Sequence, residues 1–70
     1  MMREPVASSN IVSMGYDEPS ETLEIEFSNS TIYQYFNVSA EMFEQLKYAP
    51  SKGQFLNAYI KNAYPFSRVS

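Results

Sequence analysis

Two tyrosines, Tyr33 and Tyr35, are the first candidates for contact with a ligand. Residues two apart on a β-strand point to the same face of a sheet. Two aromatic rings on one face can stack on successive unpaired bases, as they do in RNA-binding sheets. The spacing therefore predicts a stacking platform. The alternative interpretation is that both rings pack against a helix or a second subunit.

A second candidate lies where a helix is expected to begin, at Ser51, Lys52 and Gly53. Free backbone N–H groups at a helix N-terminus attract anions, and Lys52 adds a positive charge. Gly53 would allow a phosphate to approach closely. The segment predicts a site for phosphate or a nucleotide, with ordinary capping of the helix by Ser51 as the alternative.

Polar residues continue along this helix at intervals of four. Gly53, Asn57 and Lys61 would share one face, and Tyr64 would lie close to it. Lys61 is then expected to contact phosphate, and Asn57 a base or a ribose. A solvated polar face is the alternative.

Charge is divided along the chain. Residues 1–46 hold all eight acids and one base, a net charge of −7, whereas residues 47–70 hold four bases and no acid, a net charge of +4. The four bases are Lys47, Lys52, Lys61 and Arg68. A basic segment with interleaved aromatic residues suits a polyanion such as RNA, with modest and salt-dependent affinity. The alternative is four scattered, solubilising charges.

The residues that are absent limit the chemistry. The chain has no His and no Cys, which are the commonest general base, metal ligand and soft nucleophile. Its two glycines cannot form a Gly-rich phosphate loop. We therefore expect a protein that is not an enzyme, has no catalytic or metal site, and needs no cofactor.

Length and hydropathy predict one small domain, with residues 1–8 as a flexible leader and residues 9–70 as the folded part. No apolar run approaches the roughly 20 residues of a membrane span, so we expect a cytoplasmic protein with no membrane contact. Eleven Phe and Tyr residues exceed what one small core needs. This surplus favours, as a second hypothesis, a protein-interaction module or a homodimer.

The elements that must position these residues are three strands followed by two helices. Strands are predicted at 10–16, 22–27 and 31–36, and helices at 40–48 and from 51 to the proline at 65. This order predicts an α+β fold: a three-stranded antiparallel β-meander followed by two short α-helices packed on one face. Phe66 and Val69 predict that the tail docks on the domain.

A two-residue turn at Asn29 and Ser30 would set the hairpin register. It predicts that Glu24 and Glu26 share a face with Tyr35 and Tyr33, and that this face is solvated.

Several segments together resemble the KTSC domain. They are Ser8-Ser9-Asn10-Ile11, Gly15-Tyr16-Asp17, Leu23-Glu24-Ile25-Glu26-Phe27, Ile32-Tyr33-Gln34-Tyr35-Phe36-Asn37-Val38 and Ser51-Lys52-Gly53-Gln54-Phe55-Leu56-Asn57. Tyr33-x-Tyr35 is similar to the central YxY of that family. Two positions depart from the family: Ser30, where Gly is frequent, and Gln54, where a basic residue is frequent.

The family takes its name from a domain at the C-terminus of some lysyl-tRNA synthetases, and it also occurs as a small stand-alone protein in bacteria and phages. The resemblance implies a stand-alone RNA-binding module, with tRNA as the favoured target. The residues expected to contact RNA are Tyr33, Tyr35, Ser51, Lys52, Gly53, Asn57, Lys61, Tyr64 and Arg68.

Overall fold

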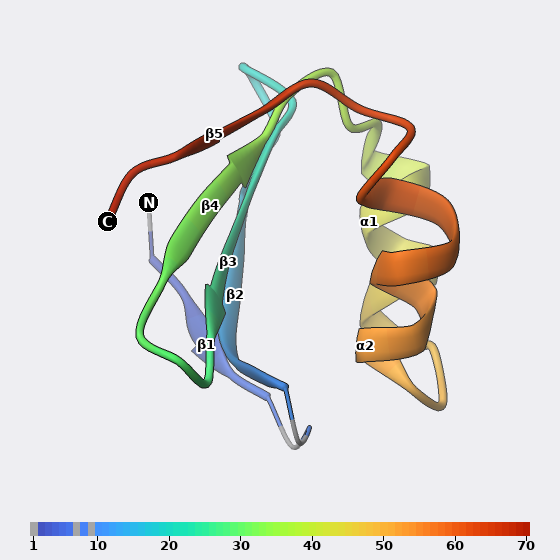
Figure 1. The fold of residues 1–70 in the computed structure, drawn as a ribbon. Helices are drawn as coiled ribbons and strands as arrows, with labels where there is room; N and C mark the ends of the chain where they lie inside the picture. Colours follow the sequence, from blue (N-terminus) through green and yellow to red (C-terminus); the bar gives the residue numbers. More distant parts are fainter. Residues whose placement is uncertain (1, 7, 9) are drawn as a thin grey trace.

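The computed structural model describes residues 2–6, 8 and 10–70 of the chain. Within these residues, five antiparallel strands form one layer and the helices form a second layer on one face of the sheet (Figure 1). The strands lie side by side in sequence order, from β1 at one edge to β5 at the other. They are β1 (Glu4–Pro5), β2 (Ile11–Asp17), β3 (Thr22–Phe27), β4 (Ile32–Tyr35) and β5 (Phe66–Arg68).

Both helices begin where the local sequence signals predict, but the second one ends at Ile60 and does not reach the proline at 65. α1 (Ala40–Lys47) is capped by Ser39, whose Oγ accepts a hydrogen bond from the Met42 backbone N–H at 3.2 Å. α2 (Lys52–Phe55) is capped in the same way by Ser51, with the Gln54 N–H at 3.4 Å. It continues directly into η1 (Leu56–Ile60), a π-helical segment.

The α+β class is confirmed, but the sheet has five strands among the described residues where three were predicted. The two additional strands are the edge strands β1 and β5, which have two and three residues. Segments this short show no alternation of apolar and polar residues that a sequence pattern can reveal. β1 forms within the expected leader, where an edge strand tolerates Pro5 because a proline has no N–H to donate. β5 forms from the tail that was expected to dock.

The predicted hairpin register is wrong by one residue. Leu23 pairs with Tyr35, and Ile25 pairs with Tyr33. The turn contains three residues, 28–30, because Ser30 adopts a left-handed φ of 71° and its N–H donates to the Phe27 carbonyl at 3.0 Å. The slip moves both tyrosines to the helix-covered face of the sheet and leaves the glutamates of β3 on the opposite face.

The core lies between the two layers. Its buried members are Ile11, Met14, Leu23, Ile25, Tyr35, Val38, Leu46, Leu56 and Ile60. Tyr16 of β2 stacks on Phe43 of α1 with ring centroids 4.7 Å apart, and its hydroxyl donates to the Val38 carbonyl. These contacts hold α1 against β2, and α2 and η1 cover the neighbouring part of the same face.

Ser30 pays a conformational cost that glycine would not, since a left-handed φ costs an L-residue roughly 1–2 kcal/mol. We expect Ser30→Gly to raise the free energy of unfolding by about 0.5–1 kcal/mol, because the greater chain entropy of Gly offsets part of the gain. Urea denaturation measures the change. Ser28→Gly is the control within the same turn, and a stabilisation there equal to that of Ser30→Gly would contradict the explanation.

Candidate functional site: a pocket between the sheet and the last helix

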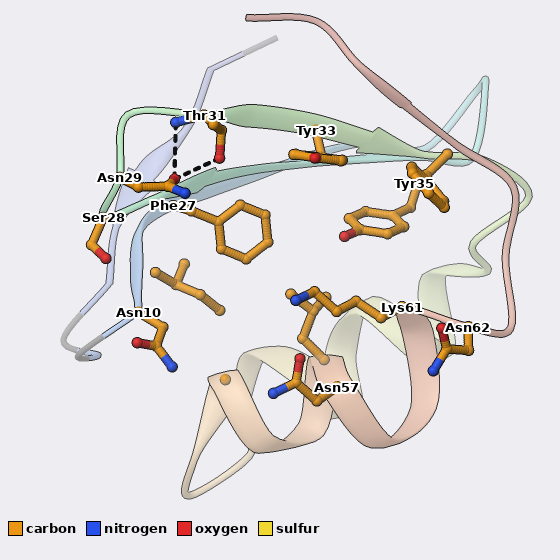
Figure 2. Close-up of a pocket in the computed structure, with 14 residues that line it drawn as sticks. Asn10, Phe27, Ser28, Asn29, Thr31, Tyr33, Tyr35, Asn57, Lys61 and Asn62 are labelled. Carbon is orange, nitrogen blue, oxygen red and sulfur yellow. Dashed lines mark hydrogen bonds between the residues drawn. The ribbon is translucent and has the colours of Figure 1, made fainter.

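A pocket of about 460 Å³ opens between the sheet and the α2–η1 helix (Figure 2). We call it the sheet–helix pocket. Its sheet side carries aromatic rings from β3, β4 and β5, and its helix side carries mainly polar side chains. The lining residues are Asn10, Ile11, Phe27, Ser28, Asn29, Thr31, Tyr33, Tyr35, Gly53, Leu56, Asn57, Lys61, Asn62 and Phe66. The volume is within the range of about 300–1,000 Å³ that is usual for small-ligand sites.

Four rings form a continuous aromatic wall. The centroid of Tyr33 lies 5.8 Å from Phe27, 6.4 Å from Tyr35 and 5.7 Å from Phe66. Phe66 also lies 5.9 Å from Tyr35, so β5 completes the wall. The Tyr33 and Tyr35 rings are nearly parallel, with an interplanar angle of 22°, whereas Phe27 is perpendicular to Tyr33 at 84° and Phe66 is tilted by 41°. Rings at these distances and angles support one another.

The π-helical segment η1 helps to aim Lys61 into the pocket. An α-helix advances about 100° per residue, so eight residues of regular helix would leave Lys61 roughly 80° around the axis from Gly53. In η1 the Lys61 N–H instead donates to the Leu56 carbonyl, five residues earlier, at 2.8 Å. This wider turn takes up part of the drift. Gly53, Asn57 and Lys61 therefore all line the pocket.

The Lys61 ammonium extends along the pocket towards the aromatic wall (Figure 2). Its Nζ lies 5.5 Å from the centroid of the Phe27 ring, a cation–π distance. Among the described lining residues, Lys61 carries the single charge, and no carboxylate is present. The electrostatic character of the pocket is therefore positive.

Tyr35 forms the deepest part of the wall, with 2% of its surface exposed. Its hydroxyl points into the space between sheet and helix (Figure 2). Burial raises the pKa of this phenol above its ordinary value of 10.0, and the neighbouring Tyr33 raises it further. The hydroxyl is therefore protonated at neutral pH and can donate a hydrogen bond.

The β3–β4 turn forms one rim of the pocket and is held in place by Asn29. The Asn29 Oδ1 accepts hydrogen bonds from the backbone N–H of Thr31 at 3.2 Å and from its Oγ1 at 2.6 Å (Figure 2). Asn and Asp commonly brace turns with this pattern.

The structure brings together five of the nine residues that the sequence singled out. Tyr33, Tyr35, Gly53, Asn57 and Lys61 line the sheet–helix pocket. The other four lie outside its lining, and their surroundings explain what each one does in the fold.

Ser51 caps α2, a helix of four residues, which is the structural alternative already considered for this position. The Lys52 ammonium turns back onto its own loop and donates to the Ala49 carbonyl at 3.3 Å. Tyr64 packs at the edge of the core, and Arg68 on β5 donates from Nε to the Ser70 carbonyl at 3.1 Å. Lys52 and Lys47 line a second, smaller hollow near β1, so these bases do not gather around Lys61.

Sequence reasoning missed several residues of the pocket. Phe27 and Phe66 are not among the residues expected to contact RNA, although both complete the aromatic wall. Asn10 and Asn62 contribute amides and had no signal in the sequence. Their roles depend on how the ends of β2 and η1 meet across the pocket.

The opposite face of the sheet carries a polar network where a solvated pair of acids was expected. Arg3 forms an ion pair with Glu24, and its Nη2 lies 3.7 Å from Oε1 of Glu26. Gln34 donates to Glu24 at 2.9 Å, and Ser13 donates to Glu26 at 2.9 Å. Glu24 is 9% exposed, so the prediction of a solvated face is wrong for this residue. The N-terminal segment that covers it was predicted to be loose.

This network makes stability depend on pH. The hydrogen bond from Gln34 lowers the pKa of Glu24 below its ordinary value of 4.5, Arg3 lowers it further, and burial opposes both. A lowered folded-state pKa stabilises the fold above the unfolded pKa of about 4.3, and this contribution is lost as the pH falls through the folded-state value. We expect the free energy of unfolding to drop below about pH 4.5.

Glu24→Gln provides the check on this assignment. The free energy of unfolding of the variant should be lower by about 1–3 kcal/mol at pH 7, because a charge-assisted hydrogen bond is removed. It should also change less between about pH 5 and pH 3. Denaturation curves across this range measure both quantities. An unchanged pH dependence in the variant would assign the acid sensitivity to another group.

In the part of the chain that the structure describes, no group of three or more His, Cys, Asp or Glu side chains could hold a metal ion. No helix there has the length and apolar character needed to cross a membrane.

Comparison with known proteins places these features in a family. A model of the KTSC domain matches residues 7–64. A solved KTSC domain protein from Yersinia pestis superposes with a TM-score of 0.95 at 36% identity, covering 99% of this chain and 97% of that one. An uncharacterized protein of Stutzerimonas stutzeri is 38% identical over 87% of this chain and 86% of its own length.

The chain is also similar to part of a larger enzyme. It is 40% identical over 62 residues to a lysine–tRNA ligase of Nostoc punctiforme, covering 89% of this chain. It spans only 11% of that ligase, and 11% of a second one from a Nostoc species at 37% identity.

Proposed function

The chain belongs to the KTSC domain family, and on this premise we propose that it binds an unpaired segment of RNA with one base in the sheet–helix pocket. A KTSC domain is a small module and not a catalytic domain. The proposed module is non-enzymatic: it would hold RNA without changing it.

The observation that carries the proposal is the meeting of an aromatic wall and one positive charge in the same pocket. Phe27, Tyr33 and Phe66 offer accessible ring surface on which a base can stack, which contributes about 1–3 kcal/mol per base in other proteins, and the buried Tyr35 ring supports them from behind. Lys61 and Asn57 face this wall from the helix. Stacking, a cation and an amide are the groups that proteins use for unpaired nucleotides.

The register of the sheet supports the proposal as well. In the predicted register, Glu24 and Glu26 would have stood beside the two tyrosines and repelled a polyanion. In the structure both glutamates lie on the opposite face and contact Arg3. The pocket face is thereby free of carboxylates among its described lining residues.

Among RNAs, tRNA is the favoured target, because lysine–tRNA ligases are among the relatives of this chain. Unpaired tRNA loops and the single-stranded acceptor end offer bases that are already free to enter a pocket. Low sequence specificity is expected for the module as a whole, because few side chains can read base edges.

A titration of the labelled protein with unmodified tRNA, monitored by amide NMR, tests the proposal. At about 50 mM salt, shifts are expected at Tyr33, Tyr35 and the α2–η1 helix, and they should weaken at about 200 mM. Lys61→Met should lower the affinity at least about tenfold, because it removes the pocket's cation.

Lys47→Met is the matched control, since it removes the same charge outside the sheet–helix pocket. It is expected to lower the affinity by less than about threefold, through general electrostatics alone. An unchanged spectrum at low salt would refute RNA binding, and equal losses in the two variants would refute the role of the pocket.

Binding to a protein partner or to a second copy of the chain is the alternative function, and exposed aromatic residues favour it. Tyr48 and Tyr59 are 75% and 58% exposed, and Phe55 lies 4.8 Å from Tyr59, outside the sheet–helix pocket. Exposed aromatic residues are enriched at interface cores. Sedimentation at rising protein concentration, without nucleic acid, would reveal self-association, and Tyr59→Ser should reduce it.

A further inference from the structure

Among the polar groups that line the sheet–helix pocket, the Lys61 ammonium can only donate hydrogen bonds, whereas the others can both donate and accept. The Lys61 ammonium has three donors and no acceptor, and no hydrogen bond or ion pair occupies it among the described residues. The protonated Tyr35 hydroxyl adds a donor from the opposite side. Asn10, Asn57 and Asn62 supply amides that can both donate and accept.

These groups set a requirement for the edge of a base that lies between them. Guanine and uracil present carbonyl oxygens where adenine and cytosine present an amino group. A carbonyl oxygen can accept from both Lys61 and Tyr35. An amino group would oppose the Lys61 ammonium donor to donor, because an ammonium has no acceptor, although the Tyr35 hydroxyl could accept from it. The N–H next to each of these carbonyls can be met by an asparagine amide, so a keto base leaves fewer buried groups unpaired.

We propose that the pocket selects keto bases, guanine or uracil, over the amino bases adenine and cytosine. Lys61 and the Tyr35 hydroxyl donate to the carbonyl of the base, and the ring stacks on the aromatic wall. This inference rests on the proposed RNA binding and adds the chemical class of base that the pocket accepts.

The test compares RNA oligomers with identical backbones, so that phosphate contacts cancel. The first pair is U8 and C8, in which the pyrimidine ring is constant and the carbonyl is exchanged for an amino group. The second pair is C8 with one central guanosine and C8 with one central adenosine. Affinities are measured by fluorescence anisotropy at about 50 mM salt.

We expect the keto member of each pair to bind at least about tenfold more tightly, as for one well-formed base contact. Lys61→Met should reduce this ratio to about threefold or less, whereas Lys47→Met should keep it. Tyr35→Phe should weaken binding of both members of each pair while keeping most of the ratio, because a hydroxyl can donate to a carbonyl and can also accept from an amino group.

The outcomes separate this inference from the function on which it rests. Selection of the keto base in both pairs, lost in Lys61→Met, supports the inference. Equal binding of all oligomers, or preference for an amino base in either pair, overturns the selection and leaves RNA binding intact. Failure of every oligomer to bind overturns both.

Discussion

Replacing Tyr35 with alanine is expected to lower the free energy of unfolding by about 3–5 kcal/mol, as for other buried aromatic residues. The ring is 2% exposed and contacts Tyr33 and Phe66 on its flanks. A chain of this length has a total stability of only roughly 4–10 kcal/mol, so much of the variant should be unfolded. Urea denaturation followed by circular dichroism measures the loss.

Tyr35→Phe separates the structural role of this residue from its proposed contact with a ligand. Because the ring is retained, stability should stay within about 1 kcal/mol of the parent, while the affinity for U8 should fall several-fold. A loss below about 1 kcal/mol in Tyr35→Ala would show that the ring contributes little to the core. Unchanged affinity in Tyr35→Phe would remove the hydroxyl from the site.

The second large effect is expected at Gly15 of β2, against which Met2 and Arg3 of the N-terminal segment lie. A Cβ at this position would lie 2.5 Å from the backbone oxygen of Met2 and 3.1 Å from Cγ of Arg3. Gly15→Ala should therefore push β1 away from β2 and separate Arg3 from Glu24. We expect a loss of about 2–4 kcal/mol, since overpacking and an unpaired, partly buried carboxylate both contribute.

Amide hydrogen exchange shows whether β1 is the segment that detaches in Gly15→Ala, because protection at the β1–β2 hydrogen bonds should fall first. Gly53→Ala is the matched control. Its nearest neighbour would be Asn10 at 3.7 Å, an ordinary contact, and alanine favours a helix by up to about 1 kcal/mol. Equal destabilisation of the two variants would refute the close approach of Met2 and Arg3 to Gly15 as the cause.

The three central strands and the starts of both helices follow from signals that are local in the sequence. Alternation of Leu23, Ile25 and Phe27 with two glutamates predicts β3 with the bounds that the structure shows, Thr22–Phe27. Ser39 and Ser51 predict the starts of both helices, because a capping hydroxyl acts on the N–H groups of the next turn. These interactions involve neighbours within four residues, so the sequence alone contains them.

The faces on which the side chains meet did not follow from the same signals. One residue in the β3–β4 turn, Ser30, changes the register and moves Tyr33 and Tyr35 from the glutamate face to the pocket. Either register places some apolar residues together. In the observed register both tyrosines pack against Phe66, which lies about 30 residues further along the chain.

By itself, the sequence determined the class of fold, the main strands, the helix caps and five of the residues that line the pocket. Only the tertiary structure decided the edge strands β1 and β5, the ion pair of Arg3 with Glu24, and the contributions of Phe66, Asn10 and Asn62 to the pocket. The physical reason is the separation along the chain between the residues that interact. Periodicity and capping act between neighbours, whereas edge pairing, ion pairs and a shared cavity join residues whose proximity exists only after the chain has packed.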